Sequence, residues 1–166
     1  MTMILNWGAT ARERSDTLPC DAVAPGASVR ADRAISIDAP PATVFAWLCQ
    51  LRVAPYSYDL LDNFGHRSPR IRDPELTDLA AGQRFMQMFE LRSFRTDQHI
   101  TLQAGSVTVT YAVRPVGRGT RLHVRVLFDG PRVIGWALAL GDVVMMRKQL
   151  LTLRELAQRE SISIKS

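Results

Sequence analysis

Cysteine is scarce in this sequence of 166 residues, and no hydrophobic run is long enough to cross a membrane. Cys20 and Cys49 are the only two cysteines, and their separation matches no metal-binding or redox spacing, so we expect reduced thiols. The longest apolar stretch, residues 133–140, reaches about half a membrane span and is soon followed by Asp142. No integral membrane segment is therefore predicted. The amino terminus also lacks the apolar core of a signal peptide, so we expect a cytoplasmic location.

A concentrated block of charge is also missing. The chain has 21 Lys and Arg residues against 16 Asp and Glu, a formal net charge of +5, and its arginines are scattered from Arg12 to Arg159. Nucleic-acid-binding proteins usually gather their positive charge on one face. We therefore expect a solvated basic surface and no nucleic-acid partner.

Motifs for metal, cofactor or nucleophilic chemistry are absent as well. The three histidines, His66, His99 and His123, have no metal-ligand spacing, so no metal is expected. No serine stands in a Gly-x-Ser-x-Gly elbow. The Gly-Arg-Gly run at 117–119 joins two predicted strands, so it is a hairpin turn and not a nucleotide-binding loop. We expect no cofactor.

The composition is typical of one globular domain with its own core. Hydrophobic residues make up 46% and charged residues 22%, which excludes wholesale disorder and fibrous architectures. We expect an N-terminal arm at 1–29 packed on the domain, a single domain at 30–160 and a short tail at 161–166. The arm has little periodicity and is predicted to be irregular, held down by Trp7 and Leu18.

The first elements of the domain are a strand followed by two short helices. Residues 30–38 alternate with period two, which predicts a half-buried strand. Prolines at 40–41 are well tolerated in a first helical turn, so a helix is expected to begin there and to run to about Leu51. A second short helix is predicted from Ser57, a capping residue, to Gly65, its stop signal.

Four antiparallel strands follow, at about 84–92, 97–103, 106–114 and 120–128. Apolar and polar residues alternate along them, so each has one apolar and one wet side. His99 and His123 fall on the polar side and are expected to face solvent. Short connections between consecutive strands indicate a meander.

The last element is a long helix over about 133–159, with an apolar row at Val143, Met146, Leu150, Leu153 and Ala157. A curved sheet with one apolar face needs a cover, and this helix is the only element long enough. The predicted class is α+β, with a curved antiparallel sheet wrapped around a long C-terminal helix. A bent sheet and a straight helix separate at one end, and the gap is a natural small-molecule site.

Several segments of the sequence, together with the predicted order of strands and helices, resemble those of a known superfamily. The segment RAISIDAPPATVFAWL at 33–48 is similar to the first strand and helix of the START-like, Bet v 1-like (SRPBCC) superfamily with its helix-grip fold. WGAT at 7–10, LPCD at 18–21, YSYD at 56–59 and GTRLHVR at 119–125 resemble a bacterial branch, the polyketide cyclase/dehydrase-like proteins.

The resemblance implies a cavity for a hydrophobic or amphipathic ligand, such as a lipid, a polyketide or an aromatic metabolite. It implies no particular reaction, because the superfamily mixes carriers, sensors and enzymes. The segment LRVAP at 51–55 departs from the branch, whose members usually have a Gly-rich, Trp-containing turn there. We therefore expect a different cavity entrance.

Asp142 is the most informative single residue, because it interrupts the most apolar part of the chain. If it faces the cavity, its carboxylate could act as a general acid or base, with Tyr58 as partner, or bind the polar head of a ligand. The structural alternative is an ion pair with an arginine of the sheet, or exposure to water.

The candidate ligand-binding residues are aromatic, sulfur-containing and polar side chains expected near the cavity. Tyr56, Tyr58 and Asp59 begin the second short helix, where tyrosine packing and helix stabilisation are the alternative roles. Met and aromatic side chains make adaptable ligand walls but fill ordinary cores equally well. The remaining candidates are Phe85, Phe89, Tyr111, Trp136, Leu138, Met145 and Gln149.

Three function classes remain open at this point. The first is a binding protein for a small hydrophobic molecule. The second is a cyclase- or dehydratase-like enzyme that uses Asp142 and a tyrosine in the cavity. The third is a protein-interaction module, a homodimer included, that uses the Arg-bearing sheet face or the helix near Leu151 and Arg154.

Overall fold

The computed structural model describes residues 5–56 and 67–165, except for the side chains of 132, 133, 135–140, 143 and 165. In chain order the elements are α2 (Ala11–Ser15), α3 (Pro19–Val23), β1 (Val29–Ile37), α4 (Pro41–Cys49), the 3-10 helices η1 (Gln50–Arg52) and η2 (Pro74–Thr77), β2 (Arg84–Phe85), β3 (Phe89–Arg95), β4 (His99–Ala104), β5 (Val107–Val116), β6 (Gly119–Phe128) and α6 (Arg132–Lys165). The second short helix expected at 57–65 lies outside the described residues.

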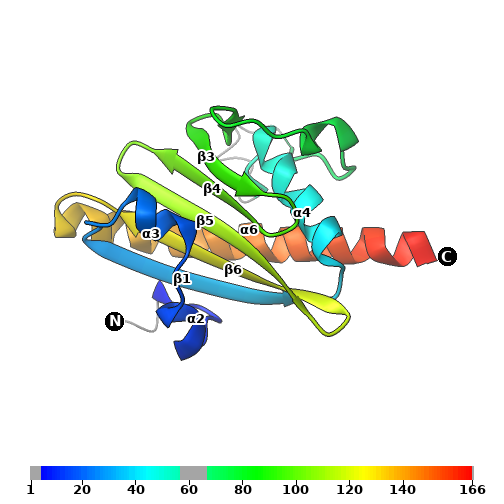
Figure 1. The fold of residues 1–166 in the computed structure, drawn as a ribbon, viewed down its shortest axis with the longest axis horizontal. Helices are drawn as coiled ribbons and strands as arrows, with labels where there is room; N and C mark the ends of the chain where they lie inside the picture. The colour runs from blue at the N-terminus through cyan, green and yellow to red at the C-terminus, as the bar shows by residue number, and fades with distance from the viewer. Residues whose placement is uncertain (1–4, 57–66, 166) are drawn as a thin grey trace.

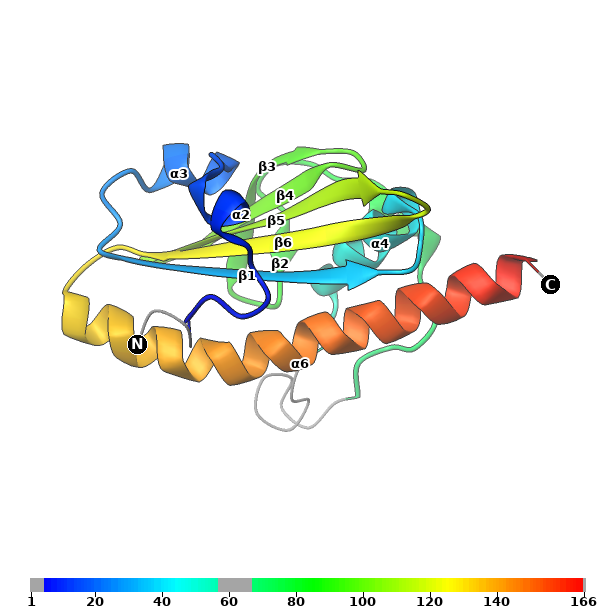
Figure 2. The same ribbon diagram turned by 90° about the horizontal axis from the view of Figure 1, so that it is seen from below.

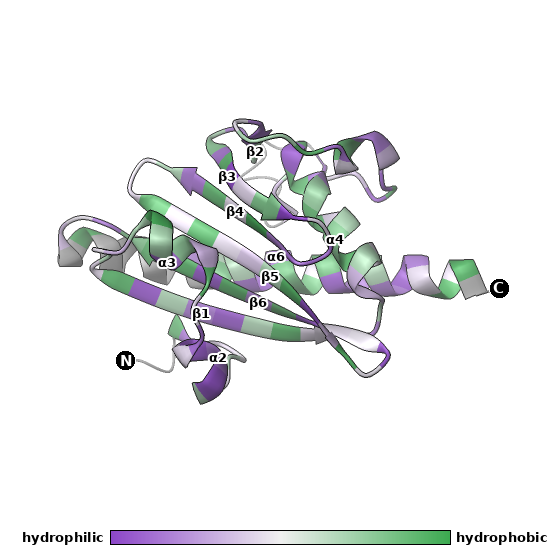
Figure 3. Ribbon diagram, viewed as in Figure 1, coloured by the Kyte–Doolittle hydropathy of each residue, from purple (hydrophilic) through white to green (hydrophobic). Residues whose placement is uncertain are grey.

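Six strands form one antiparallel sheet in the order β1-β6-β5-β4-β3-β2 (Figure 1). The period-two pattern that predicts these strands is visible as alternating hydropathy along β1, β5 and β6 (Figure 3). Figure 2 shows α6 along one face of the sheet and α2 and α3 on the opposite face. The predicted α+β class, a curved sheet against a long C-terminal helix, is confirmed.

The inner face of the sheet, the one toward α6, carries the main core. Ile35 on β1 and Val124 on β6 belong to one buried cluster with Leu150 and Leu153 of α6. These helix residues stand on one face because their spacing follows the 3.6-residue turn. At the other end of the helix, the indole nitrogen of Trp47 in α4 donates to Glu160 at 2.8 Å. Sheet, α4 and α6 therefore share one core.

The terminal helix is longer than expected. It continues to Lys165, so the segment expected as a tail at 161–166 is helical in its described part. Figure 2 shows this end of α6 projecting past the sheet. Among the described residues, no helix combines the length and the apolar character that a bilayer span requires.

The first predicted meander strand, at 84–92, is interrupted. It divides into β2 and β3 at Met86 and Gln87, whose φ angles are +46° and +66°. The amide of Met86 donates to the Leu51 carbonyl at 2.7 Å, so the chain turns against η1 instead of continuing the sheet. Neither residue is of the Gly or Asn type that signals a left-handed turn, which is why the sequence pattern missed it.

The N-terminal arm was expected to be irregular, and that prediction is wrong in its described part, because α2 and α3 are helices. Thr10 and Glu13 form a capping box. The Thr10 hydroxyl accepts from the Glu13 amide at 3.1 Å, and the Glu13 carboxylate accepts from the Thr10 amide at 2.7 Å. The Thr-x-x-Glu spacing at 10–13 is the signal that could have revealed this helix.

The outer face of the sheet is covered by this arm and is not a wet face throughout. Leu18 and Cys20 pack against Ala112 and Leu127 in a second buried cluster. The expectation that His123 faces solvent is wrong, since its ring is 0% exposed and its Nε2 lies 2.8 Å from an oxygen of Asp32. His99 is half-buried on β4.

Arg125 links the arm to the sheet, and every nitrogen of its guanidinium donates a hydrogen bond. Nε donates to Asp32 at 2.8 Å, and Nη1 donates to the Asp21 carboxylate and the Asp16 carbonyl, each at 2.7 Å. Nη2 donates to the carbonyls of Glu13 and Arg14, each at 3.1 Å. Because those carbonyls belong to the end of α2, this one side chain replaces the hydrogen bonds that a helix terminus lacks.

The arm also protects the open edge of β1. The Ala34 amide donates to the Trp7 carbonyl at 3.0 Å. Gly8 has a φ of +70°, and a Cβ built there would lie 2.2 Å from the Ala34 carbonyl oxygen. Only glycine fits this approach, and the edge is closed to pairing with another chain at that point.

Candidate functional site

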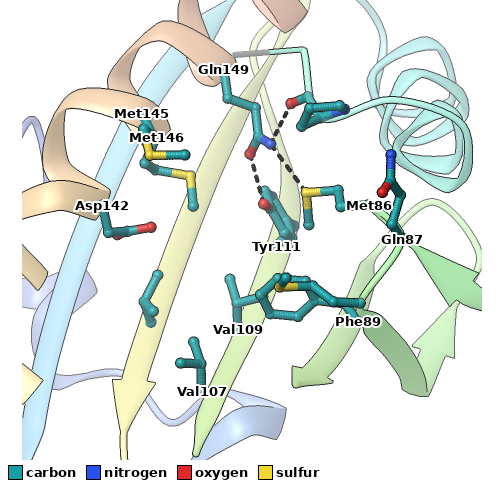
Figure 4. A pocket seen from close by; sticks show the side chains of 13 residues that line it. Met86, Gln87, Phe89, Val107, Val109, Tyr111, Asp142, Met145, Met146 and Gln149 are labelled. Carbon is teal, nitrogen blue, oxygen red and sulfur yellow. Dashed lines mark hydrogen bonds between the residues drawn. The ribbon is translucent and has the colours of Figure 1, made fainter. Parts of the chain in front are cut away.

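A cavity of about 320 Å³ lies between the inner face of the sheet and the first half of α6 (Figure 4). It is bounded by three walls, from the sheet, from α6 and from the turn between β2 and β3. The residues that line it are Val107, Val109, Tyr111 and Val126 from the sheet, Asp142, Met145, Met146 and Gln149 from α6, and Pro55, Met86, Gln87, Met88 and Phe89 from the remaining side.

The sheet wall follows from strand periodicity. Val107, Val109 and Tyr111 alternate on β5, so all three side chains stand on the inner face. Val126 of β6 is the register partner of Val109 and extends the same wall. Branched side chains keep few rotamers, so this wall is stiff.

The helix wall follows from helical periodicity. Asp142, Met145, Met146 and Gln149 are spaced by three, four and seven residues, which places them on one face of α6. Figure 4 shows all four directed toward the sheet. The two thioether side chains are flexible, so this wall can adapt its shape to a guest.

The third wall is the turn between β2 and β3. Met86 and Gln87 hold left-handed backbone conformations, which are uncommon for side chains of this kind and store strain. Met88, next in the turn, is 68% exposed although it lines the cavity. The cavity therefore has a sulfur-rich rim that faces solvent.

Gln149 organises the polar end of the cavity. Its Oε1 accepts from the Tyr111 hydroxyl at 2.6 Å, and its Nε2 donates to the Pro55 carbonyl at 2.6 Å (Figure 4). The same amide nitrogen lies 3.5 Å from the sulfur of Met86. Burial raises the pKa of Tyr111, with the Asp142 charge adding to the rise, so this phenol stays protonated at neutral pH.

Asp142 is the only charged residue among the described residues that line the cavity, and it is paired with Arg33 of β1. Nη2 of Arg33 lies 2.9 Å from Oδ2 of Asp142, and the two side chains are 1% and 25% exposed. This ion pair matches the structural alternative considered for Asp142. Burial raises the pKa of Asp142, an effect that the charge of Arg33 opposes.

Five of the predicted site residues line the cavity, namely Asp142, Phe89, Tyr111, Met145 and Gln149. Two others lie in the buried core and are not lining residues, namely Tyr56 and Phe85. Tyr56 stacks edge-on against Trp47, with ring centroids 6.0 Å apart.

Four candidates cannot be placed. Tyr58 and Asp59 lie outside the described residues, and the side chains of Trp136 and Leu138 are not described. Their assignment to the site stays a prediction.

Sequence reasoning missed two valines of the sheet wall and the arginine that pairs with Asp142. Val109 and Val126 were treated as ordinary core positions, since periodicity shows which face a residue occupies and not whether the facing space is filled. Arg33 was not singled out, although its phase with Ile35 on β1 places it on the inner face. In the described ranges, no group of three or more His, Cys, Asp or Glu residues could hold a metal ion.

No protein-family model matches the sequence, and no curated protein does. Solved structures do share the fold. A protein from Rhodobacter sphaeroides is 16% identical with a TM-score of 0.54, and the match covers 80% of this chain and 94% of that one. A protein from Nitrosomonas europaea is 13% identical with a TM-score of 0.53, covering 81% and 97%.

A third structure is described as the Aha1 dimer from Colwellia psychrerythraea. It is 14% identical with a TM-score of 0.50, and the match covers 78% of this chain and 96% of that one. At such identities the likeness is one of fold alone. This chain therefore has the helix-grip arrangement that the sequence resemblance implies, and its place in the polyketide cyclase-like branch stays a prediction.

Proposed function

We propose that this protein binds a small hydrophobic or amphipathic molecule in the cavity between the sheet and α6. The observation that carries the proposal is the cavity itself, about 320 Å³ of open volume where a solidly packed core would leave none of this size. The volume suits a molecule of metabolite size, such as an aromatic metabolite, a short lipid or a polyketide.

The lining supplies both affinity and orientation. Valine and methionine side chains dominate two walls, and a guest that buries about 300 Å² of apolar surface gains roughly 7 kcal/mol before ordering costs. Tyr111 and Gln149 form a polar end, and Asp142 lines the cavity about two helical turns away from Gln149, so the polar group of a guest has defined positions to bind. The exposed rim at Met88 is a route of entry.

Two measurements test the proposal. Native mass spectrometry of the purified protein should detect a co-purified small molecule, and the neutral dye Nile red should bind with a blue-shifted emission. Val109→Phe places an aromatic ring inside the cavity and should weaken dye binding strongly. Val116→Phe is the matched control, because Val116 is exposed on the same strand. A folded Val109→Phe variant that binds the dye as the parent does would rule out this cavity.

A cyclase- or dehydratase-like enzyme is the second candidate. It is favoured by one observation, a carboxylate with a raised pKa in the wall of an apolar cavity, which suits a general acid. Asp142 would carry the proton and Tyr58 would assist. Asp142→Ala should then abolish turnover, and turnover that survives the substitution would end this assignment.

A homodimer is the third candidate. One structure of the same fold is described as a dimer, and Ile164 is 73% exposed on the projecting end of α6. The sheet face is a poorer candidate than this end, since α2 and α3 cover much of it. Light scattering during gel filtration should return twice the monomer mass if the candidate holds, and the monomer mass if it does not.

A further inference from the structure

Arg33 is a buried cation. Asp142 balances its charge, but its guanidinium nitrogens lack hydrogen-bond acceptors among the described residues. It stands on the inner face in register with Val124, which pairs with Tyr111 on the next strand. Its contact with Asp142 is close but lacks hydrogen-bond geometry, and in the described part of the chain neither Nε nor Nη1 has a hydrogen-bond partner. The side chain is only 1% exposed, so these donors are shielded from bulk solvent.

Arg125 is a second buried arginine, and its hydrogen bonds provide a comparison for those of Arg33. Both side chains are almost fully buried, yet the Nε and both terminal nitrogens of Arg125 donate to five oxygens of the arm and of β1. A buried guanidinium with open donors is costly, and evolution of a purely structural site would fill or remove them. The contrast indicates that Arg33 holds these donors for an acceptor that the described residues do not supply.

The open donors lie behind one wall of the cavity. Asp142 lines the cavity and contacts Arg33, whereas Arg33 is not a lining residue, so the carboxylate stands between the guanidinium and the open volume. Figure 4 shows Asp142 and Tyr111 on facing walls of the same cavity. Asp142 is a quarter exposed, so it does not seal this wall completely, and a guest can approach the guanidinium beside it.

Building on the proposed ligand binding, we propose that the guest is a neutral molecule with an apolar body and a carbonyl-type oxygen, which accepts hydrogen bonds from Arg33. The acceptor must be neutral because Asp142 already balances the charge of Arg33. Among the described residues, no other charged side chain lines the cavity, so no free cation stands ready for an anionic head, which would add a second negative charge beside Asp142. Asp142 remains the counter-ion, and the carbonyl supplies the missing acceptor.

Three probes of one shape separate the possibilities. Acetylnaphthalene has a neutral acceptor, naphthoate has an anionic one, and isopropylnaphthalene has none, all substituted at the same ring position. Titration of the full chain should give a Kd for acetylnaphthalene about tenfold lower than for either of the others, the size expected for one hydrogen bond to a charged group. The preference is diagnostic because acetylnaphthalene is less hydrophobic than isopropylnaphthalene.

Two variants test the role of Arg33. In the double variant Arg33→Met with Asp142→Leu, the preference for acetylnaphthalene over isopropylnaphthalene should vanish while isopropylnaphthalene still binds. Asp142→Asn removes the opposing charge and should tighten the binding of naphthoate about tenfold or more.

Each other outcome overturns the inference in a distinguishable way. If the parent protein binds naphthoate most tightly, the guest is an anion that displaces Asp142. If acetylnaphthalene and isopropylnaphthalene bind equally, Arg33 takes no part in recognition and the cavity selects by shape alone. If none of the three binds, the proposed function fails and the inference fails with it.

Discussion

Nη2 of Arg33 lies 2.9 Å from Oδ2 of Asp142, so the first strand and the last helix are joined by an ion pair at the wall of the cavity. Two separate patterns of the sequence meet here. The alternation of β1 places a cation on the inner face, and the helical spacing of α6 places an anion opposite it. Removing either partner leaves the other charge buried without compensation.

We therefore expect Asp142→Ala to lower the free energy of unfolding by about 3 kcal/mol, because Arg33 loses its counter-ion. The double variant Arg33→Met with Asp142→Leu should stay within about 1 kcal/mol of the parent, since apolar side chains of similar size replace the pair. Urea denaturation checks both values. Equal losses in the single and the double variant would contradict the argument.

The packing of α6 against the inner face of the sheet leads to a second prediction. Leu150 is fully buried against the inner face, so Leu150→Ala should cost roughly 2 to 5 kcal/mol in the free energy of unfolding. Ile164→Ala, on the exposed projecting end of the same helix, is the matched control and should change stability by less than about 0.5 kcal/mol. A loss near zero at Leu150 would mean that the helix is peripheral to the core.

These elements could be predicted from the sequence because local periodicity determines them. Val109 and Tyr111 alternate with polar residues, and Met146, Leu150 and Leu153 recur at helical spacing, so each apolar face must be buried against the other. The same periodicities predicted that Tyr111, Met145 and Gln149 face the space between the sheet and the helix. The resemblance at 33–48 then narrowed the possible arrangements to the helix-grip fold.

The rest depends on contacts between distant parts of the chain. Periodicity assigns His123 to the outer face correctly, but its burial depends on an arm that docks through Arg125 and Asp21. The turn at Met86 is imposed by the Leu51 carbonyl and not by a turn-forming residue. No local pattern reports either contact, since both arise only when the tertiary structure forms.

The dependence of the arm on Arg125 gives a third prediction. Arg125→Lys keeps the charge but cannot reproduce the five donated hydrogen bonds, so the arm should open more often. Trypsin should then cleave after Arg12 and Arg14 about tenfold faster than in the parent, as followed by mass spectrometry of early fragments. Arg118→Lys, in the exposed turn between β5 and β6, is the control. Identical cleavage rates in all three proteins would show that the arm is held by other contacts.

The pairing of Glu13 with Arg121 makes the attachment of the arm sensitive to acid. Arg121 Nε donates to the Glu13 carboxylate at 2.6 Å, and this hydrogen bond, opposed by partial burial, lowers the pKa of Glu13 from 4.5 to about 2. A carboxyl whose pKa is lower in the folded state than in the unfolded state stabilises the fold above pH 4.5. That contribution is lost progressively as the pH falls from 4.5 toward 2.

Glu13→Gln should therefore destabilise the protein by about 2 kcal/mol at pH 7, a value reduced from the full shift because the pair is partly exposed. The difference between parent and variant should shrink as the pH falls below 4.5 and disappear near 2. Urea denaturation at a series of pH values measures it. Glu75→Gln, at an exposed carboxylate in η2, serves as control and should stay within about 0.5 kcal/mol of the parent throughout. A Glu13→Gln difference that does not change with pH would mean that the ion pair with Arg121 contributes nothing and that the amide lost only a packing contact.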